Sequence, residues 1–265
     1  MSDTLVINEI YLSLQGESTF AGLPCIFIRL TACDLRCSWC DTAYAFTEGK
    51  QMSPTEILMR VRALAVSFNS KNLAAEVTGL TSNSIAQNEP PHAGSCKLPL
   101  VELTGGEPLL QKNSLPLMQS LCDDGFTVLL ETGGAHDISP VDPRVRRIMD
   151  LKCPSSGEAE RNRWDNLKHL KATDEIKFVI GTQQDYDWTK QQISRHKLDA
   201  ICPLLCSWVH PLSPAQRDKS LKKVPVGQTP ISRRELAEKI IADALPVRFQ
   251  VQLHKVVWPP EQRGV

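Results

Sequence analysis

Residues 25–42 read CIFIRLTACDLRCSWCDT, and this stretch decides the fold. The apolar run at 25–30 is typical of a short buried strand. Three cysteines, Cys33, Cys37 and Cys40, follow it directly, so their thiols can wrap one inorganic centre. A zinc site normally takes four ligands, and this loop carries no fourth Cys or His. A four-iron cluster held by three thiolates keeps one iron open, so the spacing favours a reactive site over a structural one.

Buried strands and helices alternate along the rest of the chain. Apolar runs predict strands at 98–103, 126–131, 148–152, 175–180, 199–205 and 247–253. Helical spacing predicts helices at 53–65, near 114–123 and at 232–244. Ser53 with Glu56, and Ser232 with Glu235, have the capping-box spacing that begins a helix. Strands separated by helices imply βα units, so we expect an α/β fold with mostly parallel strands and right-handed crossovers.

Composition limits the classes of function. The chain has 265 residues and a mass of 29.5 kDa, with 42% apolar and 23% charged residues, as in an ordinary soluble domain. Its 30 basic and 30 acidic residues give no net charge, so broad attraction to nucleic acid or membrane has no support. No apolar run approaches the ~20 residues of a bilayer span, and MSDTLVINEI does not resemble a signal peptide. We therefore expect a cytoplasmic protein.

Nine cysteines are an odd and fairly high number. In a cytosolic chain they favour metal, cluster or catalytic thiols over disulfides. Those outside the loop lie on or beside apolar segments and are expected to be buried small hydrophobes: Cys25, Cys96, Cys122, Cys153, Cys202 and Cys206. An alternative is that Cys202 and Cys206 reach the loop and complete a zinc site.

Two stretches interrupt the alternation of strands and helices. Residues 67–97 are rich in Asn, Ser, Gly and Pro, and residues 207–231 hold four prolines. Both are predicted to be surface insertions. Because no change in composition demands a second domain, we expect a single domain over residues 1–265.

A second motif, TGGEP at 104–108, follows the predicted strand at 98–103. Its glycines let the backbone approach a ligand closely, and the Glu107 carboxylate can accept hydrogen bonds from an ammonium group. Together with Cys-x3-Cys-x-aromatic-Cys, where the aromatic residue is Trp39, the motif resembles the radical S-adenosylmethionine (SAM) superfamily. The resemblance implies a partial (β/α) barrel and a [4Fe-4S] cluster on Cys33, Cys37 and Cys40. In that superfamily the open iron binds SAM, which is cleaved to a 5′-deoxyadenosyl radical.

Further segments resemble one family within it, the 7-carboxy-7-deazaguanine synthases: NEIYLSLQGES (8–18), FIRL, CDT, VELTGGEP, ETGG, DLKCPSSGE and QLHK. The resemblance covers residues 5–66, 98–205 and 232–260. It implies a carbon–nitrogen lyase that converts 6-carboxy-5,6,7,8-tetrahydropterin to 7-carboxy-7-deazaguanine, with release of ammonia, in queuosine and deazapurine biosynthesis. It also implies Mg²⁺, an electron donor such as flavodoxin or ferredoxin, and a homodimer.

The resemblance assigns roles to particular residues. Contacts with SAM are implied for Trp39, Gly105, Gly106, Glu107, Glu131, Thr132, Cys153, Pro154 and Ser155, with Cys153 acting through its backbone. Contacts with the substrate are implied for Leu14, Gln15, Gly16, Glu17, Arg29, Thr104, His254 and Pro260. Thr42 is implied as a Mg²⁺ ligand, which suits a hard cation. His254 is also implied as a catalytic group for proton transfer or hydrogen bonding.

The residues themselves leave alternatives open. The Arg29 fork suits a carboxylate but could form a surface ion pair. Strand alternation would put Gln252 and His254 on one face, although a lone His is more often structural. Asp41 could cap a following helix, and Lys177 could form a structural ion pair or line the barrel.

The C-terminal segment departs from the family pattern. Some members end six residues after the histidine, and their terminal carboxylate enters the substrate pocket. Here that position is Pro260, and EQRGV follows it. We therefore expect either that the tail folds back or that a backbone carbonyl substitutes.

Two other functions are weighed. A glycyl-radical-enzyme activase shares the cysteine spacing and a similar glycine motif, but LQGES and QLHK favour the small-molecule enzyme. A non-catalytic Fe–S or zinc module would need a fourth ligand near the loop, and it leaves the glycine-containing strand ends unexplained.

Overall fold

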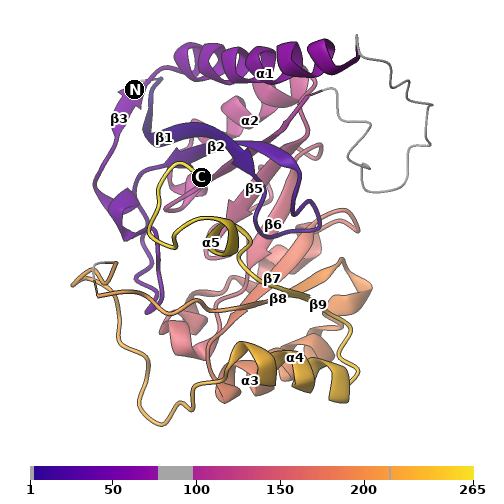
Figure 1. Cartoon of the computed structure of the whole chain (residues 1–265). Coiled ribbons are helices and arrows are strands. Elements are labelled where there is room, and N and C mark those ends of the chain that lie inside the picture. Colours follow the sequence, from indigo (N-terminus) through magenta and orange to yellow (C-terminus); the bar gives the residue numbers. More distant parts are fainter. Residues whose placement is uncertain (1–2, 77–97, 215) are drawn as a thin grey trace.

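The computed structural model describes residues 3–76, 98–214 and 216–265 (Figure 1). In these residues nine strands form one sheet: β1 (Leu5–Leu14), β2 (Pro24–Leu30), β3 (Lys50–Met52), β4 (Leu100–Gly105), β5 (Val128–Thr132), β6 (Arg146–Asp150), β7 (Glu175–Ile180), β8 (Leu204–Trp208) and β9 (Arg248–Gln250). The helices are α1 (Pro54–Glu76), α2 (Ser114–Asp123), α3 (Gln183–His196), α4 (Arg233–Ala242) and α5 (His254–Val257). The predicted α/β fold is confirmed.

The strand order is β3-β1-β2-β4-β5-β6-β7-β8-β9. The strands β3, β1 and β2 pair antiparallel, and every pair from β2 to β9 is parallel. The carboxyl ends of seven strands therefore meet at one edge of the sheet. In α/β proteins this edge is where ligands bind.

Side chains alternate between two faces of the strands. One face packs beneath α1 to α4 and forms the main apolar core, with Ile26, Ile28, Leu103, Leu130, Phe178 and Ile180 among its residues. The other face carries a smaller apolar cluster, made of Phe20, Cys25, Phe27, Leu100, Leu129 and Ile148. Further along the strands this second face becomes polar, as at Glu102 and Lys177, which are both buried. This second face is the inner face of the sheet. It is apolar toward the start of the parallel strands, which we call the apolar floor, and polar toward their carboxyl ends.

Several predicted boundaries are wrong. The helix predicted at 53–65 continues to Glu76, so part of the predicted insertion at 67–97 is helical, and residues 77–97 lie outside the described residues. The strand predicted at 199–205 begins only at Leu204, after a short 3-10 helix at Leu198–Ala200. The last strand ends at Gln250, and His254 opens the short helix α5, so strand alternation does not place it. β1 was not predicted as a strand.

The second predicted insertion, 207–231, begins inside β8, since Ser207 and Trp208 belong to that strand. From 209 to 231 the described residues form no helix and only one isolated bridge, between Thr182 and Pro230. The Trp208 indole donates to the Ile231 carbonyl oxygen at 2.8 Å, which fixes both ends of this segment.

No helix among the described residues is long and apolar enough to cross a membrane.

Two glycines, the last residue of β4 and the one after it, allow the ends of β2 and β4 to touch. Gly105 has a φ of +126°, and a Cβ on Gly106 would lie 1.9 Å from the carbonyl oxygen of Ala32. The Gly106 amide donates to Leu30 at 3.0 Å, and the Glu107 amide donates to Ala32 at 2.8 Å. The glycines are thus required by the backbone just before Cys33, whatever ligand binds there.

We predict that Gly106→Ala lowers the free energy of unfolding by about 2–4 kcal/mol, because its methyl group meets backbone rather than a movable side chain. Urea denaturation followed by circular dichroism measures the change. Gly125→Ala is the control: its φ is +86°, but nothing lies within 4 Å of its Cβ, so only about 1 kcal/mol should be lost. Equal losses would contradict the argument from close packing.

Candidate active site

A cavity of about 220 Å³ opens at the carboxyl edge of the sheet. It gathers most of the residues selected from the sequence: Leu14, Gln15, Gly16, Glu17, Arg29, Cys33, Cys37, Trp39, Cys40, Thr42, Thr104, Gly105, Gly106, Glu107, Glu131, Thr132 and His254. These residues come from both ends of the chain and from its middle. The structure therefore brings the sequence motifs together in one place.

The three cysteines of the loop after β2 line this cavity with free thiols. Burial raises the pKa of the Cys33 thiol to about 11 and that of Cys37 to about 12. The loop is fixed to the chain after β6, because the Ser38 hydroxyl donates to the Ser155 carbonyl oxygen at 2.7 Å and the Arg36 amide donates to Glu158 at 2.7 Å. The ligand loop is thus held independently of any metal.

The cysteine loop supplies three thiols to the cavity, and cysteine thiolates are the donors that an iron–sulfur cluster takes. Among the described residues no three His, Cys, Asp or Glu side chains converge on one ion position. Cys202 and Cys206, considered as zinc ligands, lie in the main apolar core and do not line the cavity.

The Glu107 carboxylate joins β4 to β5. It accepts from the Thr132 hydroxyl at 2.9 and 3.0 Å, from the Gly133 amide at 2.8 Å and from the Leu109 amide at 3.0 Å. Burial raises its pKa. These bonds fix the orientation of a carboxylate that lines the cavity, as a binding group requires.

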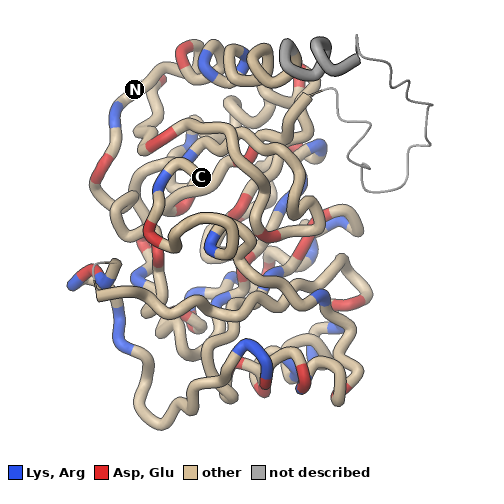
Figure 2. The backbone as a smooth tube through the Cα atoms, viewed as in Figure 1, with Lys and Arg blue, Asp and Glu red and all other residues tan. Residues whose placement is uncertain are grey.

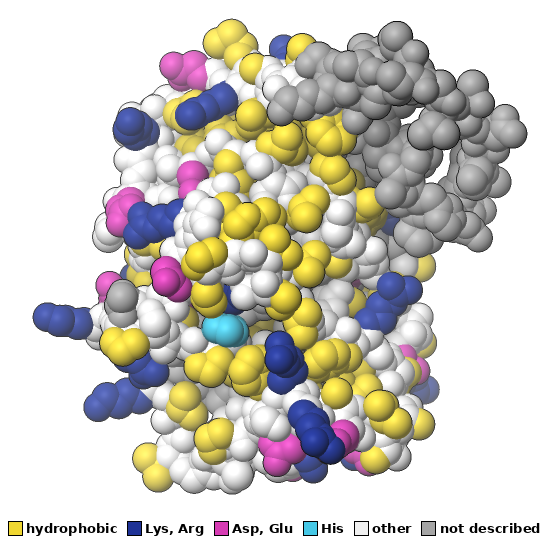
Figure 3. Space-filling view, in the orientation of Figure 1, with side chains coloured by type: hydrophobic (Ala, Val, Ile, Leu, Met, Phe, Trp, Pro, Cys, Tyr) yellow, Lys and Arg dark blue, Asp and Glu magenta, His cyan; other side chains and the backbone are white. Residues whose placement is uncertain are grey.

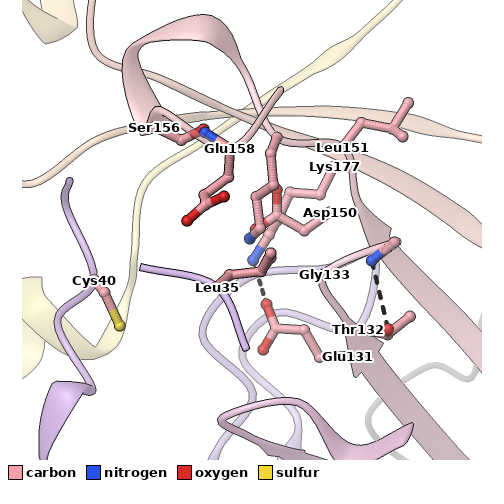
Figure 4. A network of polar contacts seen from close by, with 12 residues as sticks. Leu35, Cys40, Glu131, Thr132, Gly133, Asp150, Leu151, Ser156, Glu158 and Lys177 are labelled. Atoms are coloured by element: carbon pink, nitrogen blue, oxygen red, sulfur yellow. Dashed lines mark hydrogen bonds and ion pairs between the residues drawn. The ribbon is translucent and has the colours of Figure 1, made fainter. Parts of the chain in front are cut away.

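A buried ion network lies on the inner face of the sheet (Figure 4). The Lys177 ammonium pairs with two carboxylates, that of Glu17 at 3.2 Å and that of Glu131. Figure 4 shows Lys177 and Glu131 among the polar residues of this region. The Thr104 hydroxyl donates to Glu131 at 2.9 Å. Burial acts to raise the pKa of Glu17, but the Lys177 charge, the nearby His254 and the hydrogen bond from Gln252 together lower that pKa to about 2. Lys177 therefore both forms an ion pair and lines the cavity.

Glu102 on β4 is a buried carboxyl in the same cavity, 2% exposed. The Gln15 side-chain amide donates to it at 2.7 Å. Burial, followed by the nearby Glu131 carboxylate, raises the pKa of Glu102 to about 8. At neutral pH this carboxyl is mostly protonated, so it can both donate and accept a hydrogen bond.

Arg29 lies directly across from Glu9, because their two strands pair in that register. Its Nε donates to Glu9 at 2.7 Å, and an Nη donates to the Tyr11 hydroxyl at 2.9 Å. The guanidinium side chain is only 13% exposed and faces the cavity, so the pair is internal rather than on the surface. Tyr11 stacks on Phe27, with ring centroids 5.2 Å apart, and so supports the same wall.

The C-terminal segment forms the opposite wall. Gln252 donates to Glu17 at 3.0 Å, and the Leu253 amide donates to the Gly16 carbonyl oxygen at 3.0 Å. A Cβ on Gly16 would lie 2.7 Å from Nδ1 of His254, so this glycine is needed for contact with the histidine. Burial lowers the pKa of His254, so at neutral pH its imidazole is mostly neutral.

Asp41 pairs with Lys255 instead of capping a helix. Burial opposes ionisation of Asp41, but Lys255 lowers its pKa to about 2. Thr42 precedes the 3-10 helix Ala43–Phe46 without capping it through its side chain, and its hydroxyl lies 3.7 Å from the Cys40 sulfur. This hydroxyl is thus beside the cysteine loop, and its role as a Mg²⁺ ligand stays a prediction.

The tail after α5 folds back. Pro260 and Val265 line a neighbouring cavity of about 410 Å³, and Val265 also lines the first cavity. The Pro260 carbonyl oxygen accepts from Gln216 at 3.1 Å, so it does not point freely toward a ligand. Of the two expected arrangements, folding back of the tail is the one observed.

Three predicted SAM contacts do not line the cavity: Cys153, Pro154 and Ser155. Ser155 is 1% exposed, and its hydroxyl and its amide both donate to the Asp185 carboxylate. Cys153 is fully buried in the apolar core. As the structure stands these residues support the cysteine loop, and their contact with SAM stays a prediction.

Known proteins are similar to this chain over almost its whole length. A scan against models of protein families gives no match. The chain is 38% identical to the 7-carboxy-7-deazaguanine synthase of Koribacter versatilis over 260 residues, covering 98% of this chain and 99% of the relative. It is also 38% identical to the synthase of that name from Chlorobaculum tepidum over 264 residues, covering 98% and 97%. The chain belongs to the 7-carboxy-7-deazaguanine synthase family.

The fold is likewise similar to that of QueE from Escherichia coli, with a TM-score of 0.62, 22% identity and 95% of each chain covered. At this identity the likeness concerns the fold alone.

For this family member, sequence reasoning missed four cavity residues, Tyr11, Glu102, Asp150 and Lys152. It also missed Glu9 and Ser207, which bond to the cavity side chains Arg29 and Glu17. Glu102 could have been found, because it is an acidic residue in a mostly apolar strand. Asp150 gave a weaker signal, since its strand also holds Arg146 and Arg147. Asp150 pairs with Lys152 at 2.7 Å, while its other carboxylate oxygen has no partner among the described residues. Ser207, whose hydroxyl donates to Glu17 at 3.1 Å, gave no such signal.

We predict that Lys177→Met lowers the free energy of unfolding at pH 7 by about 3–5 kcal/mol, because it leaves Glu17 and Glu131 buried without their shared cation. In the unaltered chain the low pKa of Glu17 adds stability above pH 4.5 that is lost as the pH falls toward 2. This contribution should shrink in the variant. Chemical denaturation at several pH values measures both effects.

Lys168→Met is the matched control. Lys168 is 64% exposed and lies 3.6 Å from Asp165, so its loss should cost less than about 1 kcal/mol. If the two substitutions cost the same, Lys177 would not be the cation that holds this network.

Proposed function

We propose that this chain converts 6-carboxy-5,6,7,8-tetrahydropterin to 7-carboxy-7-deazaguanine with release of ammonia, by radical SAM chemistry. One observation carries the proposal: three free cysteine thiols and the Glu17–Lys177–Glu131 network line the same cavity. The near full-length similarity to relatives named as this synthase supports the same substrate.

In this proposal Cys33, Cys37 and Cys40 hold a [4Fe-4S] cluster. When bound, the cluster and SAM supply a radical that abstracts a hydrogen atom from the substrate. The Gly105–Gly106 backbone and Glu107 hold the cofactor's amino group, because that carboxylate is fixed in orientation by β5.

The substrate's two ends require different partners. Its carboxylate suits Arg29, a guanidinium held by Glu9 and Tyr11 at the cavity wall. Its pterin edge presents both donors and acceptors, which suit ionised Glu17, protonated Glu102 and the amide of Gln15. His254, neutral and beside Gly16, is placed to accept or return a proton. Thr42 is the proposed protein ligand for Mg²⁺.

The proposal also covers the partners of the protein and its location in the cell. Cleavage of SAM needs one electron, so it requires a donor such as flavodoxin or ferredoxin. Homodimer formation and a cytoplasmic location rest on the family resemblance.

The test is an anaerobic assay. After reconstitution with iron and sulfide, the chain should form 7-carboxy-7-deazaguanine from SAM, Mg²⁺, dithionite and the carboxypterin, as detected by mass spectrometry. Cys37→Ala should lose bound iron and all product, because one cluster ligand is gone. Cys122→Ala is the control, since Cys122 lies on α2 away from the cavity. Formation of 5′-deoxyadenosine without the expected product would refute the substrate and favour an activase.

We predict that Arg29→Ala raises the KM for the carboxypterin by about thirtyfold, because it removes a charge-assisted hydrogen bond of about 2 kcal/mol. Iron content and the visible spectrum of the cluster should not change. Arg62→Ala, which removes a guanidinium paired with Asp124 on the outer surface, should leave the KM unaltered. An unchanged KM in Arg29→Ala would show that the substrate carboxylate binds elsewhere.

A further inference from the structure

The segment at 216–223, named here the basic segment, is unusually positive for a chain with no net charge. It holds Arg217, Lys219, Lys222 and Lys223, but only one acidic residue, Asp218. All four basic side chains are exposed. Figure 3 shows Lys and Arg side chains protruding at the left edge of the molecule, where the backbone of this segment runs in Figure 2. The chain thus has a locally positive surface although its net charge is zero.

This segment is attached to the cysteine loop. The Lys222 amide donates to the carbonyl oxygen of Arg36, which lies between Cys33 and Cys37, at 2.9 Å. The buried Glu158 carboxylate accepts from the Arg36 amide at 2.7 Å and pairs with the Lys222 ammonium at 2.9 Å. One buried acid therefore clamps the basic segment onto the loop that carries the proposed cluster ligands.

The remaining positive charges of the segment are not used within the described chain. Lys222 is paired, but Arg217, Lys219 and Lys223 form no ion pair with any described residue. Unpaired exposed charges on one surface raise the rate at which a partner of opposite charge arrives, and they orient it. Because these charges lie beside the cysteine loop, they attract such a partner to the outer side of that loop.

We propose that the basic segment is the docking surface for an acidic electron-donor protein. The inference rests on the proposed function, which requires one electron per SAM cleavage. That electron leaves the donor's reduced prosthetic group and lowers the charge state of the cluster by one, with no bond made or broken. Docking here brings the donor next to the loop between Cys33 and Cys37 without blocking the substrate cavity, because neither Lys219 nor Lys223 lines it.

The experiment compares two double charge reversals in the reconstituted enzyme. Lys219→Glu/Lys223→Glu changes the basic segment, and Arg60→Glu/Arg195→Glu makes the same change in net charge on α1 and α3. An acidic flavodoxin serves as the probe. Its Kd for the enzyme is measured by fluorescence anisotropy at several salt concentrations, and turnover is measured with flavodoxin and, separately, with dithionite.

For the unaltered enzyme we expect a Kd that rises with salt. In Lys219→Glu/Lys223→Glu the Kd at low salt should rise about tenfold or more, its salt dependence should flatten, and flavodoxin-driven turnover should fall in parallel. Dithionite-driven turnover should stay within about twofold, and the control pair should change little. Unchanged flavodoxin binding, or an equal loss in both pairs, would overturn the docking surface. Absence of product with dithionite in the unaltered enzyme would instead overturn the proposed function.

Discussion

The arrangement of the site depends on one buried cation, the ammonium group of Lys177. It lies on β7, a strand buried between β6 and β8, and holds together two carboxylates from distant parts of the chain, Glu17 and Glu131. Without it, both carboxylates would be buried beside each other, and burial of uncompensated charge is costly. The N-terminal loop is positioned through Glu17, and the end of β5 is positioned through Glu131. The Lys177 ammonium therefore holds two walls of the cavity in place.

The strands that carry this network explain how one sheet serves two purposes. In β7 all six residues are buried, yet Phe178 and Ile180 pack in the apolar core while Glu175 and Lys177 face inward. Alternation along a strand separates the two environments by one residue. The apolar floor around Phe27 and Leu129 closes the inner side at its base, so the polar groups are confined to the edge where the cysteine loop lies.

The secondary structure could be predicted from the sequence where the signals are local. β7 was predicted with its observed bounds, and the capping box of Ser232 and Glu235 correctly began α4. The predicted last strand failed because the alternating pattern continues past Gln250, whereas the chain turns there to bond Leu253 to Gly16. α1 was predicted too short, because weak helix formers after Ala65 do not stop its backbone hydrogen bonds. The motifs selected cavity residues well, but the partners of Arg29 and Lys177 depend on tertiary contacts that spacing does not encode.

The contact between Gln252 and Glu17 joins positions 235 residues apart. The cavity wall that the C-terminal segment forms depends on this long-range contact, and closing so long a loop is slow. A chain still being synthesised would carry its cysteine loop on an open sheet edge, accessible to iron delivery and also to oxygen. Assembly of the inorganic centre is thus easiest before the C-terminal segment arrives, and its protection begins afterwards.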